Sequence, residues 1–186
     1  MPELRNGMHL YHGSYCEVEF PDLSKCARFK DFGQGFYLTS SREQAVSFAK
    51  ISTGKAIGRN LIRPQNFGVV STYTFATGAE LNIRDYPSAD ADWLHCVIGH
   101  RRNRYFSDVV KQCTGYDVIS GKIANDQTNA VIITYLDGLY GEIGSENADN
   151  ICISLLLPEP LNDQFCFRTP KALGTLRFEG SERIWL

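Results

Sequence analysis

Short apolar runs, many of them rich in β-branched and aromatic residues, alternate along this chain with clusters of turn-forming residues. Runs of this kind predict strands. The clearest is residues 68–75, where apolar and hydroxyl side chains partly alternate, as in a long strand. Shorter strands are predicted at residues 8–11, 36–39, 116–120 (ending at Gly121), 164–168, 176–178 and 183–185, with Leu81 and Ile83 as a short continuation after the long strand.

The first helix is predicted directly after the strand at residues 36–39. Ser40 or Ser41 can act as its N-cap, because a serine oxygen accepts a hydrogen bond from a free backbone N–H of the first turn. Glu43 would lie in that turn, where a carboxylate interacts favourably with the helix dipole. Apolar residues then continue at helical spacing, and we expect the helix to end before Gly54 or Gly58.

Three further segments predict helices, namely residues 90–106, 129–140 and 147–157. The middle segment is apolar and also fits a strand, but its length favours a helix. Thr169 followed by Pro170 indicates an N-cap with proline at the first helical position, which opens one turn of helix. The mixture predicts an α+β fold, and a chain of 186 residues has the size of one domain, residues 1–186.

The composition is that of an ordinary globular protein without a strongly basic surface. A net charge of −2 and a pI near 6.1 argue against tight, charge-driven binding of nucleic acid. No apolar run approaches the roughly 20 residues of a membrane span, and the N-terminal residues predict no signal peptide. The six cysteines include no Cys-x-x-Cys pair, so we expect reduced thiols and a cytoplasmic location.

The most informative stretch is residues 32–39, with the sequence Phe-Gly-Gln-Gly-Phe-Tyr-Leu-Thr. Paired glycines can cradle a phosphate at the start of a helix. Here the predicted helix begins only after a strand and a serine turn, so the glycines are better explained as shaping the entry to the strand of Tyr37. Residues 10–14, with the sequence Leu-Tyr-His-Gly-Ser, form a second motif at the end of the first predicted strand.

These two motifs, with an aromatic residue at Phe48 in the following helix, resemble the NAD-binding core of ADP-ribosyltransferases. The similarity is to the His-Tyr-Glu branch, which includes diphtheria toxin and the poly-ADP-ribose polymerases. In the polymerases the first strand ends in His-Gly-Ser, and the second lies in a Phe-Gly-x-Gly-Ile-Tyr-Phe pattern. From Leu10 to about Phe178 the chain resembles a small bacterial family of unknown-function domains in this superfamily, some of them suspected toxins of toxin–antitoxin pairs.

The resemblance implies an ADP-ribosyltransferase-like fold, in which two short packed β-sheets form an NAD cleft with helices around it. His12 would bind the hydroxyls of the adenosine ribose. Gly13 would pair its backbone with the nicotinamide carboxamide, since glycine allows the closest approach, and Ser14 would support the carboxamide. Tyr37 and Phe48 would sandwich the nicotinamide ring, where aromatic contacts add about 0.5–1.5 kcal/mol beyond burial.

The third element of the resemblance departs from the pattern. The polymerases carry a catalytic glutamate at the start of a strand, and Gln164 takes that place here. Breaking the nicotinamide–ribose bond builds positive charge on the sugar, as in glycoside hydrolysis. A glutamine keeps the hydrogen bond to the ribose but lacks the negative charge. Asp163 is a poor substitute because neighbouring strand residues point to opposite faces.

A second candidate for the missing carboxylate is Asp126, in the polar loop that follows the strand at residues 116–120. Loops after strands commonly carry site residues, although capping the following helix is the simpler role for Asp126; Asn125 is an alternative to it at the site. Arg28, on the loop between the two motifs, is a candidate for holding the pyrophosphate.

Each candidate also has a plain structural interpretation. His12, Tyr37 and Phe48 could be ordinary core residues, but the two motifs together favour a site. His95 and His100 are five residues apart on a predicted helix, which is not the spacing of a helical metal pair, so no zinc site is predicted. We interpret the arginines at 101, 102 and 104 as a solvated helix end that favours the dipole, with the binding of a pyrophosphate or an acceptor as the alternative.

We therefore expect a mono-ADP-ribosyltransferase that uses NAD as substrate, needs no metal and releases nicotinamide. The near-neutral charge favours a protein acceptor over a nucleic acid, and the toxin resemblance implies a small antitoxin partner. Two alternatives remain open. One is an NAD glycohydrolase, in which water replaces the acceptor. The other is a module that binds NAD or ADP-ribose without turnover, which the glutamine at Gln164 keeps in consideration.

Overall fold

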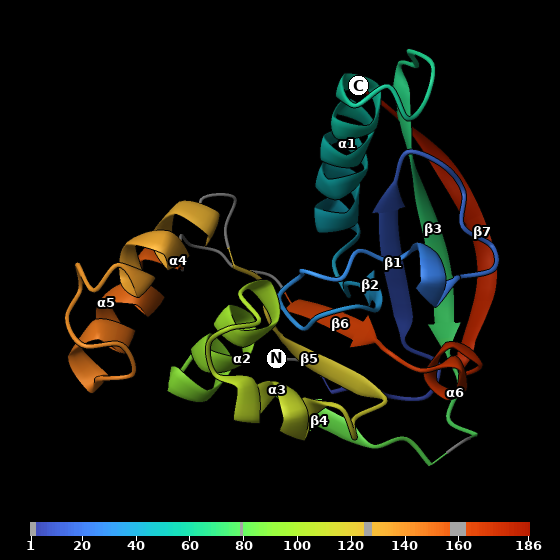
Figure 1. Cartoon of the computed structure of the whole chain (residues 1–186). Coiled ribbons are helices and arrows are strands. Elements are labelled where there is room, and N and C mark those ends of the chain that lie inside the picture. The colour runs from blue at the N-terminus through green and yellow to red at the C-terminus, as the bar shows by residue number, and fades with distance from the viewer. Residues whose placement is uncertain (1–2, 79, 125–127, 157–162) are drawn as a thin grey trace.

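The structure is a computed structural model that describes residues 3–78, 80–124, 128–156 and 163–186. The strands in these residues are β1 (His9–Ser14), β2 (Phe36–Leu38), β3 (Phe67–Phe75), β4 (Ile83–Asp85), β5 (Val118–Lys122), β6 (Asp163–Phe167) and β7 (Leu176–Trp185). The helices are α1 (Arg42–Gly58), α2 (Ala91–Arg101), α3 (Ser107–Cys113), α4 (Thr128–Leu136), α5 (Glu146–Leu156) and α6 (Pro170–Leu173), with a 3-10 turn η1 (Leu23–Lys25). The predicted α+β class is confirmed (Figure 1).

The first sheet contains β1, β3 and β7, antiparallel and with β3 in the centre. Helix α1 lies against this sheet (Figure 1), where Ala45, Ala49 and Val70 form a small buried cluster. The helix backbone approaches closely, since a Cβ on Gly68 would lie 2.8 Å from the Ala49 carbonyl oxygen. The side chain of Ser41 accepts a backbone N–H of the first turn, so the predicted N-cap is confirmed.

The second sheet contains β2, β6, β5 and β4 in that order, with β4 and β5 parallel and the other neighbours antiparallel. The backbones of Tyr11 and Thr39 exchange two hydrogen bonds of 2.9 and 3.0 Å, so β1 and the end of β2 meet where the two sheets adjoin. The sheets share a buried core made of Leu10, Phe36, Leu38, Tyr73, Phe75, Val118, Phe165, Phe167 and Ala172.

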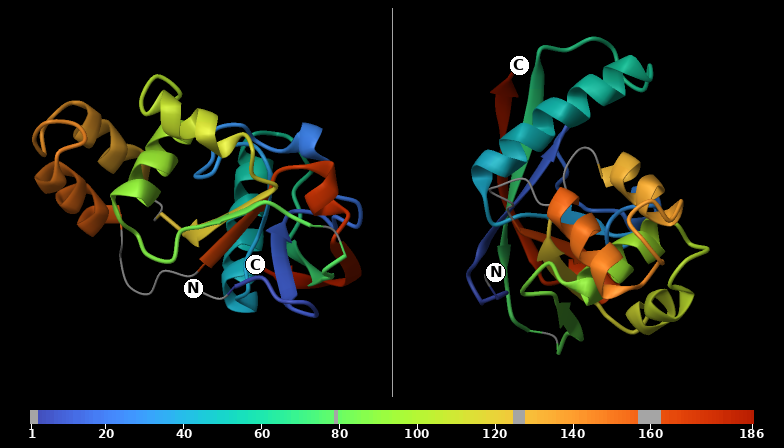
Figure 2. Two further views of the ribbon diagram at one scale, coloured as in Figure 1. Left: turned by 90° about the horizontal axis from the view of Figure 1, so that it is seen from below. Right: turned by 90° about the vertical axis from the view of Figure 1, so that its left-hand side faces the viewer.

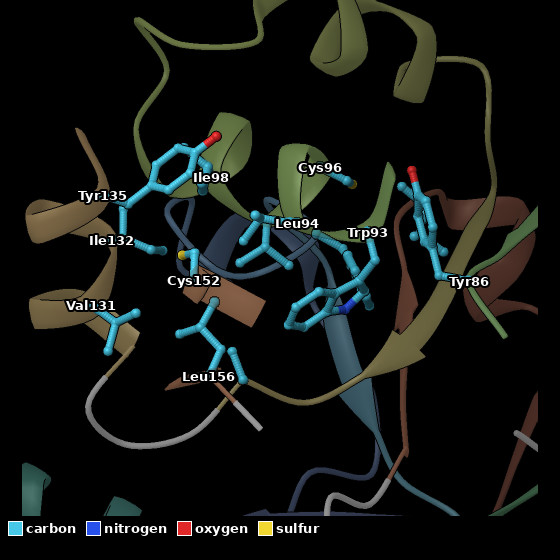
Figure 3. Close-up of a cluster of buried hydrophobic side chains, with 14 of the residues drawn as sticks. Tyr86, Trp93, Leu94, Cys96, Ile98, Val131, Ile132, Tyr135, Cys152 and Leu156 are labelled. Carbon is cyan, nitrogen blue, oxygen red and sulfur yellow. The ribbon is translucent and has the colours of Figure 1, made fainter. Parts of the chain in front are cut away.

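Helices α2 to α5 pack with the other side of the second sheet around a further buried cluster. Figure 3 shows Trp93 and Leu94 of α2 near side chains from α4 and α5. Figure 1 and the left view of Figure 2 place α4 and α5 at the end of the molecule away from β3 and β7. His95 Nε2 lies 2.8 Å from an oxygen of the buried Asp149, whose other oxygen accepts from the Tyr135 hydroxyl. Polar contacts thus join α2, α4 and α5.

The prediction of one helix over residues 90–106 is wrong for the second part of that segment. Helix α2 ends at Arg101, and Phe106 adopts a left-handed φ of 50° before α3 begins. The break lets α3 fold back onto α2, where a Cβ on Gly99 would lie 2.8 Å from Val110 Cγ2. A residue other than glycine rarely adopts positive φ, so nothing in the local sequence marks this turn.

Two predicted strand ends are also wrong. Strand β5 continues through Gly121 to Lys122, and the glycine is needed for packing because a Cβ there would lie 2.7 Å from Phe32 Cζ. The two closing strands are one strand, β7, whose register against β3 shifts beside Gly180. The other predicted strands and helices are present, with small differences at their ends. None of the helices in the described residues combines the length and apolar character that a membrane span requires.

Candidate functional site

His12 lies on β1 at the point where the two sheets meet. Its Nδ1–H donates to the Tyr37 carbonyl oxygen at 2.8 Å, and its ring lies 4.4 Å from that of Phe36 between centroids. A carbonyl only accepts, so this bond puts the proton of the neutral imidazole on Nδ1 and leaves Nε2 as an acceptor. Burial lowers the pKa of His12, which keeps the ring neutral at pH 7.

Gly13 directs its peptide groups to the same junction. Along a strand, successive residues direct their N–H and C=O groups to opposite edges. Gly13 is two residues after Tyr11, so the N–H and C=O of Gly13 point to the same edge of β1 as those of Tyr11, which pair with Thr39. In the described residues Gly13 makes no backbone hydrogen bond outside its own sheet. A Cβ on Gly13 would lie 2.0 Å from the Ala45 carbonyl oxygen. Close packing of α1, rather than a ligand ring, therefore already requires glycine here.

Tyr37 is held rigidly by the loop that precedes it. Its hydroxyl accepts from Phe32 N–H at 2.9 Å and donates to the Gly33 carbonyl at 2.8 Å. Burial, with smaller contributions from Cys166 and from the charge of Asp31, raises the pKa of Tyr37 well above its ordinary value of 10.0. The hydroxyl therefore stays protonated. Tyr37 pairs with Cys166 across β2 and β6, and therefore shares a sheet face with Gln164, two residues earlier on β6.

Gln164 is buried, and its amide nitrogen has two acceptors. Nε2 donates to Asp31 Oδ2 at 2.8 Å and to the Lys122 carbonyl at 3.1 Å. Both partners can only accept in these states, so the nitrogen must face them and Oε1 points elsewhere. No donor to Oε1 is present in the described residues, which leaves this oxygen available to a hydroxyl.

Asp31 is the site residue that the sequence analysis missed. Asp31 is 4% exposed, and its carboxylate accepts from Arg101 Nε at 2.6 Å as well as from Gln164. The interpretation of Arg101 as a solvated helix end is therefore wrong, because its side chain is only 24% exposed and pairs with Asp31. The position of Asp31 directly before the Phe32 motif was the one available signal.

Positive side chains gather beside this pair. Lys30 is exposed to solvent, but partial desolvation lowers its pKa, and the charges of Arg101, Lys55 and Arg59 lower it further, whereas Asp31 raises it. Like charges close enough to act on one another favour an anion that binds among them. This group is therefore a stronger candidate for a pyrophosphate than a single arginine.

Asp163 has a structural task, which agrees with the prediction that it is a poor substitute for the missing glutamate. Its carboxylate accepts from Ser40 N at 3.0 Å, from Ser40 Oγ at 2.7 Å and from Thr39 Oγ1 at 3.3 Å. These bonds fix the turn between β2 and α1. Asp163 therefore cannot serve as the carboxylate beside Gln164.

Several predicted site residues are not brought to this junction. Phe48 is 40% exposed on α1, and none of the described aromatic ring contacts joins it to Tyr37. Ser14 is buried at the end of β1, and Arg28 is exposed without an ion pair in the described residues. Asp126 lies outside the described residues, so its predicted role stays a prediction.

The comparisons with known proteins give the chain a family. Residues 8–178 match the family described as "Protein of unknown function (DUF3990)". The chain belongs to this family. A search of curated proteins finds no match. The region shared with the DUF3990 family begins before His12 and ends after Gln164, so it contains the whole group around the sheet junction.

This DUF3990 protein also has a surface hollow of about 350 Å³ away from the junction, lined by Gln34, Tyr116, Arg168 and neighbouring residues. None of His12, Tyr37 and Gln164 lines it.

Proposed function

We propose that this DUF3990 protein is an NAD-dependent mono-ADP-ribosyltransferase with an ADP-ribosyltransferase-like fold. The observation that carries the proposal is the meeting of His12 and Tyr37 where the two sheets adjoin, with Nδ1 of His12 2.8 Å from the Tyr37 carbonyl oxygen. This contact unites the two motifs that resemble the NAD-binding core, although they are separated by a long loop.

The chain's own groups support a binding mode for NAD. The free N–H and C=O edge at Gly13 is complementary to a carboxamide, which has both a donor and an acceptor. Nε2 of His12 can accept from a ribose hydroxyl, because Nδ1 holds the proton. The cations around Lys30 would attract the pyrophosphate.

Gln164 would act on the ribose during cleavage. The nicotinamide–ribose bond breaks with its electron pair leaving on the nicotinamide nitrogen, and positive charge develops on the sugar. Oε1 of Gln164 would accept the ribose 2′-hydroxyl, with the amide oriented by Asp31 and the Lys122 carbonyl. The acceptor nucleophile then bonds to the anomeric carbon and loses its proton to solvent or to a base.

Asp31 would supply negative charge to the site through the Gln164 amide. Its carboxylate polarises that amide, so that Oε1 becomes a better acceptor. The ion pair with Arg101 offsets part of this charge. The same offset favours the second candidate function, a module that binds NAD without turnover, because no uncompensated carboxylate faces the ribose.

The biological setting rests on sequence arguments, namely the resemblance for an antitoxin partner, the near-neutral charge for a protein acceptor and the cysteine pattern for the location. A protein acceptor, a small antitoxin partner and a cytoplasmic location stay predictions. An NAD glycohydrolase remains the alternative among enzymes, with water as the nucleophile.

The test measures NAD binding by calorimetry and nicotinamide release by chromatography on the same preparation. The proposal predicts both, and labelled NAD with a cell lysate should leave label on protein. Binding without any nicotinamide would establish the binding module instead, and release without labelled protein would establish the glycohydrolase. Gln164→Ala should lower release more than binding, whereas Gln112→Ala, at an exposed glutamine on α3, should change neither.

A further inference from the structure

Helices α2 and α3 bring two cysteines and a histidine together in the interior. Cys96 and His100 are four residues apart on α2 and so lie on one face of the helix. Cys113 is the last residue of α3. One ligand atom from each of the three lies within 4.8 Å of the others, and all three residues are buried. Figure 3 shows Cys96 on the side of α2 toward Tyr86.

The two sulfur atoms have the separation of metal ligands rather than of a disulfide. Cys96 Sγ and Cys113 Sγ are 3.8 Å apart, and both cysteines are free. Two sulfur ligands about 2.3 Å from a tetrahedral zinc ion lie about 3.8 Å apart. A disulfide would need a sulfur–sulfur distance of about 2.0 Å.

His100 points to a missing partner in the same place. His100 is 8% exposed, and its Nε2 atom is buried without a hydrogen-bond partner in the described residues. Buried polar nitrogens are normally paired. The other edge of the His100 ring packs on Gly33. A Cβ added to Gly33 would lie 2.7 Å from Nδ1 of His100. The ring therefore has no room to turn toward the loop.

The surroundings suit a cation held by thiolates. Arg168 Nη1 donates to the backbone carbonyl of Cys113, so a fixed positive charge lies beside the cysteine pair. A thiolate is the form that binds metal. Cys113 also lines a surface hollow of about 120 Å³ with Tyr86 and Tyr116, which offers an entry path and space for a water ligand.

We propose that Cys96, His100 and Cys113 bind a zinc ion, with a water from the neighbouring hollow in the fourth position. Thiolate and imidazole ligands together select zinc among the common divalent ions. Zn²⁺ displaces the protons of the two thiols, so the ion with its two thiolates and neutral imidazole carries no net charge. That balance matters because the guanidinium of Arg168 donates to the backbone carbonyl of Cys113.

The ion would fasten α2 to α3 and support the loop of the candidate site. His100 packs on Gly33, and the next residue, Arg101, pairs with Asp31. A metal that fixes the end of α2 therefore also fixes Asp31. The zinc inference rests on the cysteine–histidine group alone and holds whether or not the protein cleaves NAD.

The test uses the full chain, purified under reducing conditions, and measures zinc content by mass spectrometry of the metals. The protein is then stripped with a chelator and titrated with cobalt(II) as a spectroscopic probe. We expect one metal per chain, thiolate-to-cobalt charge-transfer absorption, visible bands of a tetrahedral ion, and a rise in the melting temperature with zinc. His100→Ala and Cys113→Ser should weaken cobalt binding by at least the roughly 10–100-fold that loss of a supporting contact costs.

Matched controls separate this group from the other cysteines. Cys152→Ser, at a fully buried cysteine on α5, and Cys16→Ser, at an exposed one, should leave the absorption unchanged. Wild-type protein that binds no stoichiometric cobalt, or whose cobalt spectrum lacks the thiolate charge-transfer absorption, would overturn the proposal. If a variant fails to fold, the wild-type cobalt spectrum still decides, because its bands report the sulfur ligands directly.

Discussion

Replacing Gln164 by glutamate adds the carboxylate that the polymerases carry at the corresponding place, but Asp31 determines its effect. The new carboxylate would take the position of an amide nitrogen that lies 2.8 Å from Asp31 Oδ2. Two negative charges at this distance repel by about 6 kcal/mol at an effective dielectric constant of 20. Both positions are buried, so water screens the repulsion little. One carboxyl must therefore stay protonated at pH 7.

A second substitution removes this conflict. In Asp31→Asn/Gln164→Glu the asparagine can still accept from Arg101 with its oxygen and can donate with its amide to the new carboxylate. The negative charge is thereby moved from position 31 to position 164, which we propose faces the ribose. The Lys122 carbonyl, 3.1 Å from Nε2 of Gln164, then loses a donor, which should lower the free energy of unfolding by about 1–3 kcal/mol.

The assay is nicotinamide release at pH 7, with urea unfolding to verify that each variant folds. We expect Gln164→Glu alone to give no gain over wild type and the double substitution to give a clear gain. Gln112→Glu, at an exposed glutamine, serves as the control for an added charge. An equal gain from Gln164→Glu alone would refute the coupling to Asp31. A folded double variant that binds NAD but releases no more nicotinamide would refute the role of charge at this position.

Three further predictions concern β1. His12→Ala should weaken NAD binding, measured by calorimetry, by at least about tenfold, because one hydrogen bond is lost. His9→Ala, at an exposed histidine on the same strand, is the control and should leave NAD binding unchanged. Gly13→Ala should lower the free energy of unfolding by about 1–3 kcal/mol or more, because its Cβ would lie 2.0 Å from the Ala45 oxygen; an unchanged urea midpoint would show that α1 does not pack there. Folding lowers the pKa of His12 from 6.5, so the unfolded chain binds a proton more readily at this residue than the folded chain does. The contribution of neutral His12 to the free energy of unfolding is therefore fully present above pH 6.5 and is lost as the pH falls through the pKa of the folded state. Urea unfolding at several pH values should therefore show a smaller loss toward low pH in His12→Ala than in wild type.

Local signals predicted the elements whose ends are fixed by local bonds. Ser41 and Thr169 each accept a backbone N–H of the helix they precede, so their caps could be predicted from neighbouring residues. The long strand β3 was predicted because its side chains alternate. The contact between His12 and Tyr37 was expected only through the resemblance, since no local pattern brings the two motifs together.

Features that depend on packing between distant segments could not be predicted. Asp31 and Gln164 are separated by 133 residues, and nothing near either residue announces the other. Phe48 has an apolar side chain at a helical spacing, yet the close packing of α1 uses the small residues Ala45 and Ala49 and leaves Phe48 half exposed. The cysteine–histidine group on α2 did have a local signal, the spacing of four residues between Cys96 and His100, but its third member depends on the turn at Phe106.

A crystal structure of the protein with NAD tests the central claim most directly. The account predicts the nicotinamide carboxamide on the N–H and C=O of Gly13, a ribose hydroxyl on Nε2 of His12, and the other ribose on Oε1 of Gln164. NAD bound instead in the hollow beside Gln34 and Arg168, with the sheet junction unchanged, would contradict it.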